Sequence, residues 1–101
     1  MGTYVLLSSL TPEGRESLHK SPDRLGAVNE EIEKLGCKVL TQYALMGPYD
    51  FLTIIEGPDN ETVAHLVIDL GARKTVNIMS SPAIEIADLM AKLSGAEHLA
   101  P

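Results

Sequence analysis

The sequence is poor in cysteine, in aromatic residues and in long apolar runs, and each scarcity excludes a class of protein. Cys37 is the single cysteine, so no internal disulfide forms and no zinc site is built from several thiolates. With no Trp and one Phe among 101 residues, the expected core is aliphatic. No apolar run approaches the roughly 20 residues of a membrane-spanning helix. Met1–Leu7 lacks the basic start of a signal peptide, so we expect a cytoplasmic protein.

Basic residues are also scarce, and they are scattered along the chain. Lys and Arg total 8 against 14 Asp and Glu, which gives a formal net charge of −6. Nucleic-acid-binding domains carry a basic patch or stripe that neutralises phosphates, and the sequence has none. An anionic membrane surface would also repel a chain of this charge. We therefore expect neither a nucleic acid nor a membrane as a partner.

The strongest local signal is Lys38–Glu56, in which two β-rich runs flank Gly47–Asp50. Pro48 fixes φ near the value required at the second position of a type I turn. This pattern predicts a β-hairpin with a tight turn, in which Met46 lies opposite Phe51.

The rest of the sequence alternates between β-rich and amphipathic segments. After Ser21, apolar residues recur with a helical period as far as Leu35, and Gly36 stands where such a helix is expected to end. The order β-α-β-β-α-β is typical of the ferredoxin-like α+β fold, a four-stranded antiparallel sheet with two helices on one face and the first and third strands at its centre. The other predicted elements are a strand over Thr3–Leu10, a short helix over Thr11–Lys20, a helix from Asp59 to Gly71, a strand over Thr75–Ser80 and a C-terminal helix over Ile86–Leu93.

Both faces of the predicted hairpin are mainly apolar, although helices on one side of the sheet cover only one face. An antiparallel sheet with one wet face alternates apolar and polar residues, and a large uncovered apolar face promotes aggregation. The uncovered face is expected to meet another subunit or the C-terminal helix, and we predict a homo-oligomer, either a dimer or a higher assembly. One face would carry Leu40, Gln42, Ala44, Met46, Phe51, Thr53 and Ile55, and the other Val39, Thr41, Tyr43, Leu45, Leu52, Ile54 and Glu56.

A series of short motifs supports a family assignment. They are Thr3–Ser8, Thr11–Gly14, Ser21–Arg24, the turn Gly47-Pro48-Tyr49-Asp50, and Gly57–Asp59. With these motifs the chain resembles the GYD domain family, which is named for a Gly-Tyr-Asp motif. The resemblance implies a ferredoxin-like domain of the dimeric α+β barrel type and brings no catalytic residues. The hairpin is also similar to that of leucine-responsive regulators, whose effector domains bind amino acids between subunits. We expect one domain over residues 1–95 and a flexible tail over 96–101.

Tyr43, Tyr49 and Asp50 are polar side chains concentrated on an otherwise aliphatic hairpin. In a structural role, Asp50 would bond nearby backbone and Tyr49 would cover the end of the hairpin. In a functional role, all three would line a small pocket at a subunit boundary, because a tyrosine buried on an apolar face needs a partner for its hydroxyl. We predict these three as ligand-binding residues for a small molecule and identify no catalytic residue.

The remaining residues indicate no metal site and no cofactor. His19, His65 and His98 lack the spacing of metal ligands, although a haem-ligand role for His19 or His65 is a minor alternative in barrels of this type. Cys37 is expected to be a buried, inert thiol. No phosphate loop, nucleophile elbow or zinc-protease motif is present.

The sequence is compatible with three functions. The first is a small-molecule-binding oligomeric module. The second is a cofactor-independent monooxygenase or isomerase, and the third is an accessory subunit of a larger assembly. Without a catalytic motif, a binding role is favoured over an enzyme.

Overall fold

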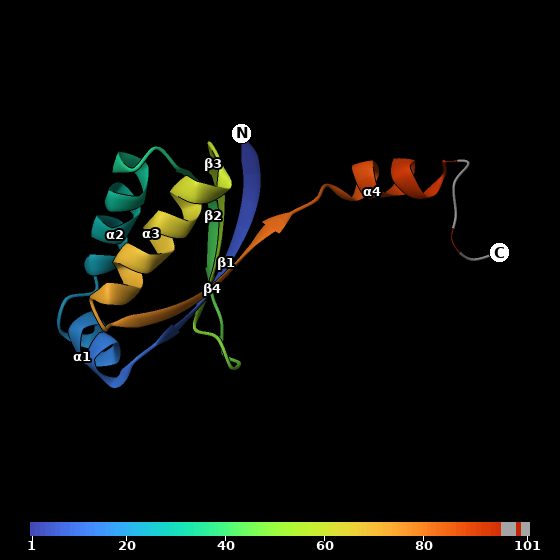
Figure 1. The fold of residues 1–101 in the computed structure, drawn as a ribbon. Helices are drawn as coiled ribbons and strands as arrows, with labels where there is room; N and C mark the ends of the chain where they lie inside the picture. Colours follow the sequence, from blue (N-terminus) through green and yellow to red (C-terminus); the bar gives the residue numbers. More distant parts are fainter. Residues whose placement is uncertain (96–98, 100–101) are drawn as a thin grey trace.

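The computed structural model of the chain describes residues 1–95 and residue 99. Figure 1 shows one sheet with three helices against one face and a fourth helix that stands apart from the body. The predicted tail over 96–101 lies, apart from Leu99, outside the described residues. Along the chain the elements are β1 (Gly2–Leu10), α1 (Pro12–Lys20), α2 (Arg24–Lys34), β2 (Lys38–Ala44), β3 (Phe51–Gly57), α3 (Asn60–Ala72), β4 (Val76–Ala83) and α4 (Ile86–Leu93).

The four strands are arranged in the order β2-β3-β1-β4, and every neighbouring pair is antiparallel. β1 and β3 therefore lie at the centre of the sheet and β2 and β4 at its edges, as the sequence predicts. α1 and α2 together form the first crossover and α3 forms the second, all on the same face (Figure 1). The chain thus has the predicted α+β ferredoxin-like fold.

Three helix boundaries are set by the local signals that predict them. Thr11 Oγ1 accepts a hydrogen bond from the backbone N–H of Gly14 at the start of α1. Asp59 Oδ1 accepts one from the backbone N–H of Thr62 at the start of α3. These acceptors satisfy N–H groups that have no partner inside a helix. Gly36 follows α2 with a φ of 90°, a left-handed conformation that glycine adopts without strain.

Two boundaries differ from the prediction. α3 continues through Gly71, and Lys74, with a φ of 66°, makes the left-handed turn toward β4. β4 continues through Pro82 rather than ending at Ser80. A strand at a sheet edge can include proline, because one side of that strand has no hydrogen-bonding neighbour.

The predicted register of the hairpin is wrong. Ala44, not Met46, pairs with Phe51, and the backbone N–H of Leu45 donates to the carbonyl oxygen of Asp50 at 2.7 Å. Residues 46–49 therefore connect the two strands, one position earlier than predicted. The backbone N–H of Asp50 donates to the carbonyl oxygen of Ser8 in β1 at 2.7 Å. Asp50 therefore closes the hairpin through its carbonyl oxygen and is tied to β1 through its N–H.

A second irregularity of the hairpin lies at Leu40. The pairing of β2 with β3 shifts between Val39 and Thr41, which leaves Leu40 as the extra residue of a β-bulge. Strict alternation would place Val39 on the face away from the helices. The bulge instead turns Val39 to the helix side, where it packs against the core.

The core lies between the sheet and the helices, and its buried side chains are mainly aliphatic. Leu6, Ile55 and Leu66 are its largest fully buried side chains and come from β1, β3 and α3. Ile32 is the buried residue of the predicted apolar stripe on α2. Cys37 is buried as predicted, and this burial raises the pKa of its thiol, which keeps the thiol protonated and unreactive.

Candidate functional site

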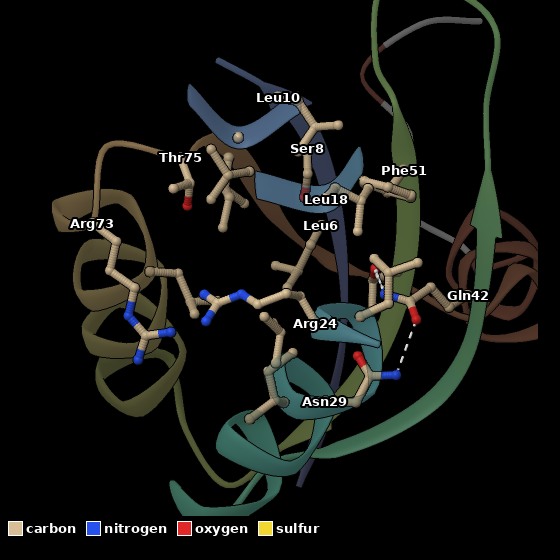
Figure 2. Close-up of a pocket in the computed structure, with 18 of the residues that line it drawn as sticks. Leu6, Ser8, Leu10, Leu18, Arg24, Asn29, Gln42, Phe51, Arg73 and Thr75 are labelled. Atoms are coloured by element: carbon tan, nitrogen blue, oxygen red, sulfur yellow. Dashed lines mark hydrogen bonds between the residues drawn. The ribbon is translucent and has the colours of Figure 1, made fainter. Parts of the chain in front are cut away.

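A cavity of about 110 Å³ lies between the sheet and helices α1, α2 and α3. Figure 2 shows its lining side chains converging from the strands and from the helices. Protein interiors are close-packed and hold few voids larger than a water molecule, so a cavity of this size is a candidate binding site. Its walls are mostly apolar and include Leu6, Leu18, Val28, Phe51 and Leu70.

The α1 wall of the cavity is held close to the start of β4. The backbone N–H of Thr11 donates to the carbonyl oxygen of Thr75 at 3.1 Å, and Thr11 Oγ1 donates to the carbonyl oxygen of Lys74 at 2.7 Å. Gly14 lies directly against Thr75, where an added Cβ atom would come within 1.9 Å of the carbonyl oxygen. Only glycine permits this approach, so Gly14 determines how near α1 lies to the sheet.

Three polar side chains form a hydrogen-bonded chain along one side of the cavity. Asn29 Nδ2 donates to Gln42 Oε1, and Gln42 Nε2 donates to Thr53 Oγ1, each at 3.0 Å. Asn29 Oδ1 is buried and has no hydrogen-bond partner among the described residues. Figure 2 shows this oxygen turned away from Gln42, toward the side chains that line the cavity. An unpaired buried polar atom costs about 1–3 kcal/mol, so a donor that reaches this oxygen after a small turn of the Asn29 side chain would be bound favourably there.

Two arginines supply positive charge at the cavity. Arg73 follows α3 and forms a two-point ion pair with Glu31, in which the Nη1–Oε1 distance is 2.8 Å. The hydrogen bonds from Arg73 lower the pKa of Glu31, and those to Glu31 raise the pKa of Arg73. The side chain of Arg24, at the start of α2, extends across the cavity in Figure 2. Within residues 1–95 and 99 it forms no hydrogen bond or ion pair, so its guanidinium can bind an anion.

The lining of the cavity offers binding groups rather than a general base. A base that works near neutral pH is most often a His, Asp, Glu, Cys, Lys or Tyr side chain. None of these residue types is found among the described lining residues. Apart from the two arginines, the hydrogen-bonding side chains of the lining are hydroxyls and amides, namely Ser8, Ser17, Asn29, Gln42, Thr53 and Thr75.

The three predicted ligand residues lie away from this cavity. Tyr43 is 59% exposed and lies on the opposite face of the edge strand β2. Tyr49 is half-buried in the connection between β2 and β3. Asp50 Oδ2 accepts a hydrogen bond from the backbone N–H of Leu10 at 2.7 Å, which ties the hairpin to the end of β1. None of the three is among the residues that line the cavity, and their role as a ligand site stays a prediction.

Arg24, Asn29 and Gln42 are the cavity residues that sequence reasoning missed. A signal was present for Asn29, which stands four residues after Leu25 and three before Ile32, within the apolar stripe of α2. A polar residue at such a position is turned toward the core, where it needs a hydrogen-bond partner. The sequence could not identify that partner, because Gln42 belongs to a strand in a different layer.

The sheet face opposite the cavity has an apolar centre with polar residues such as Thr3, Ser9 and Ser81 around it, and no described helix covers it (Figure 1). Its residues alternate along the strands with the buried residues of the helix side. Tyr43 lies on the same side, at the β2 edge. We use the term outer face for the apolar side chains Val5, Leu7, Leu52, Ile54 and Met79.

Residues 84–95, here called the arm, extend away from the sheet beyond β4 (Figure 1). α4 lies in this arm and has no buried residue, and Ile86, Met90 and Leu93 are 68%, 61% and 61% exposed. These residues repeat at helical spacing and form an apolar stripe. Isolated helices shorter than about 12 residues are marginal in water. A helix of 8 residues therefore needs a surface against which its stripe can pack.

The histidines do not form a metal centre in the described part of the chain. His65 Nε2 lies 3.0 Å from Asp69 Oδ2 on the exposed side of α3, and His19 is exposed on α1. No group of three or more His, Cys, Asp or Glu side chains is placed to hold a metal ion among residues 1–95 and 99. None of the described helices is long and apolar enough to span a bilayer.

Comparisons with known proteins agree with the resemblance seen in the sequence. The family model of the GYD domain matches residues 4–93. The chain is 45% identical over 94 residues to a Thermus thermophilus protein described as "Glutamine synthetase and cystathionine beta-lyase binding protein", and the match covers 92% of this chain and 99% of that protein. The crystal structure of TTHA0845 from Thermus thermophilus matches with a TM-score of 0.55 and 22% identity, over 84% of this chain and 95% of that chain. This likeness supports the fold alone.

Proposed function

The chain belongs to the GYD domain family, and we propose that it is a homo-oligomeric accessory protein that binds a metabolic enzyme and catalyses no reaction itself. The observation that carries this proposal is the uncovered apolar surface made by the outer face and the arm. Large exposed apolar patches mark contact sites in soluble proteins. The similar Thermus thermophilus protein is named for binding glutamine synthetase and cystathionine beta-lyase, and we extend a role of this kind to the present chain.

A second copy of the chain is the proposed partner of the outer face. Two sheets packed face to face would remove Val5, Leu7 and Ile54 from water, and burial of apolar area stabilises an interface by about 25 cal/mol per Å². The arm leads away from its own sheet (Figure 1), so its apolar stripe is free to pack on a neighbouring protomer. The central residues of β1 and β3 support this arrangement, since they are apolar on both faces of the sheet.

Tyr43, Tyr49 and Asp50 are retained as proposed small-molecule contacts at the subunit boundary. Tyr43 lies on the side of the sheet that a second protomer would cover, and its side chain is exposed in the single chain. Tyr49 lies at the end of the same hairpin. A role in ligand binding would require the partner protomer to close a pocket over Tyr43.

The alternative function, a cofactor-independent monooxygenase or isomerase, has less support. Both reactions need a group that accepts a proton from the substrate. The cavity on the helix side is lined by amides, hydroxyls and arginines, and its described lining holds no residue suited to that task at neutral pH. We therefore favour binding over catalysis.

Sedimentation velocity tests the proposed assembly. The wild-type chain of 10.9 kDa is expected to sediment as a dimer or a larger species at micromolar concentration. Met90→Glu places a charge on the apolar stripe of α4 and is expected to shift the protein toward the monomer. Ala91→Glu, on the opposite side of the same helix, is the matched control and should leave the assembly unchanged. A monomeric wild-type chain would contradict this part of the proposal.

Biolayer interferometry tests the enzyme partner. The immobilised chain is presented with glutamine synthetase and with cystathionine beta-lyase from its own organism, and saturable binding of at least one is expected. The activity of the bound enzyme is then measured with and without the chain. If the chain binds neither enzyme saturably, the accessory role that the relative's name suggests is overturned.

A further inference from the structure

The cavity on the helix side has the features of a binding site that the proposed function does not use. It lies across the sheet from the outer face, so the two surfaces are independent. An engineered cavity of about 150 Å³ in another protein is large enough for benzene. By that comparison, a cavity of about 110 Å³ accommodates a ligand body with a few carbon atoms, whose polar end points to the mouth.

Asn29 provides the first recognition element. Its Nδ2 is bound to Gln42, whereas its Oδ1 is buried without a partner among the described residues. If the amides of Asn29 and Gln42 were both rotated by 180°, Asn29 Oδ1 would accept from Gln42 Nε2, Thr53 Oγ1 would donate to Gln42 Oε1, and the Asn29 nitrogen would be the atom left over. In either orientation one hydrogen-bonding atom of Asn29 is unpaired. A ligand that occupies the cavity therefore gains from a small polar group on its apolar body.

Arg24 provides the second recognition element. The chain carries a net charge of −6, yet the charged side chains at the cavity are Arg24 and the Arg73–Glu31 pair, which sum to one positive charge. Glu31 makes its hydrogen bonds with Arg73 and is only near Arg24, whose charge also lowers the pKa of Glu31, so the hydrogen-bond donors of the Arg24 guanidinium are available to a ligand. A guanidinium binds a carboxylate through two parallel hydrogen bonds. This local excess of positive charge on an acidic chain favours an anionic ligand.

We propose that the cavity binds a small aliphatic carboxylic acid that carries one hydrogen-bond donor on its chain. The carboxylate pairs with the guanidinium of Arg24, and the donor, a hydroxyl or an amine, bonds to Asn29 Oδ1. The aliphatic body lies against Leu6, Leu18 and Val28. A water molecule would satisfy Asn29 as well, but it would make no two-point contact with the exposed Arg24 and would fill little of the apolar volume.

An NMR titration with three related probes tests this proposal. The probes are α-hydroxyisocaproate, which has the carboxylate and the donor, isocaproate, which lacks the hydroxyl, and isocaproamide, which also lacks the charge. Each is added at millimolar concentration to the ¹⁵N-labelled full chain, and amide shifts are followed. Affinity is expected to fall in that order, and the shifts should lie at Leu18, Val28 and Phe51 rather than on the outer face.

Two variants separate the contributions of charge and hydrogen bonding. Arg24→Gln is expected to weaken binding of α-hydroxyisocaproate by about tenfold or more, the factor for loss of a hydrogen bond to a charged group, and to leave isocaproamide unaffected. Lys34→Gln, near the other end of α2 and outside the cavity lining, is the matched control and should change neither. Asn29→Leu should abolish the preference for α-hydroxyisocaproate over isocaproate. If leucine does not fit at this position, Asn29→Ser is used to compare the same two acids.

Three results would overturn the proposal. The first is the absence of saturable shifts at the cavity with any of the probes. The second is equal affinity for isocaproate and isocaproamide, which would exclude Arg24 as the anion-binding group. The third is a set of shifts confined to Tyr43, Leu52 and their neighbours, which would place the ligand on the other side of the sheet. Binding to a partner enzyme is measured in a separate experiment, so a negative result in the NMR titration would not contradict the proposed accessory function.

Discussion

Asp50→Ala is expected to destabilise the fold by about 1–2 kcal/mol. The carboxylate of Asp50 accepts a hydrogen bond from the backbone N–H of Leu10 at 2.7 Å, and the backbone N–H of Asp50 donates to Ser8. A hydrogen bond to a charged group contributes about 1.5–3 kcal/mol when it is buried. Leu10 and Asp50 are both half-buried, so water replaces part of the lost bond and the lower part of this range applies.

Urea unfolding followed by circular dichroism measures this effect, at one fixed protein concentration because assembly adds to the apparent stability. Asp50→Asn keeps an oxygen acceptor without the charge and should lose about half as much, since charge-assisted bonds are roughly twice as strong as neutral ones. Asp23→Ala is the control, because the side chain of Asp23 makes no capping hydrogen bond to α2. The midpoint for thermal unfolding should fall by about 4–8 °C for each kcal/mol lost.

The comparison also separates the two roles considered for Asp50. If Asp50→Ala unfolds at the same urea concentration as Asp23→Ala, the bond to Leu10 does not hold the hairpin, and the structural role is refuted. If the loss is as expected and a small molecule still stabilises the variant equally, Asp50 is a structural residue and not a ligand contact.

The helix side of the sheet offers three further tests. Gly14→Ala should destabilise by about 1–3 kcal/mol, because its Cβ would collide with the carbonyl oxygen of Thr75. Gly26→Ala has open space around the new Cβ and should instead stabilise α2 by about 0.5–1 kcal/mol in the same unfolding assay. Arg73→Gln should raise the pKa of Glu31, measured by ¹³C NMR of its carboxyl, because the hydrogen bonds from Arg73 hold that pKa down. The Arg73–Glu31 pair therefore stabilises the fold fully at a pH above the pKa of Glu31 in the unfolded chain. This stabilisation disappears as the pH falls through the pKa of Glu31 in the folded chain. At a partly exposed site it amounts to less than about 1 kcal/mol. Equal stability of the two glycine variants, or an unchanged Glu31 titration, would contradict these expectations.

The parts of the fold that the sequence predicts correctly are those set by local chemistry. Thr11 caps α1, Asp59 caps α3 and Gly36 ends α2, and each acts through atoms only a few residues away. The hydrophobic period of Ile86–Leu93 likewise predicts α4 with its observed bounds. From the order of such elements the ferredoxin-like topology follows, since few arrangements of four strands satisfy the crossover rule.

The register of the hairpin and the cavity could not be predicted, because both depend on contacts distant in sequence. Asp50 pairs with Leu45 across the hairpin and donates its backbone N–H to Ser8 of β1, a contact between residues far apart in the sequence. One wall of the cavity, α1, is placed by the contact of Gly14 with Thr75, two residues far apart in the sequence. Asn29 and Gln42 meet across two layers, and a single sequence does not show which polar residues will face one another.

The pairing of β1 with β4 has a consequence for biosynthesis. Thr3 pairs with Ala83 and Leu10 with Val76, so one edge of β1 has no partner until the chain has been translated beyond residue 83. Topologies dominated by such distant pairs fold slowly, and an unpaired strand edge can recruit another chain in the meantime. A nascent chain that stalls before β4 exposes that edge beside the apolar Val5 and Leu7. Truncated products of this chain are therefore expected to aggregate or to become substrates of cellular proteases.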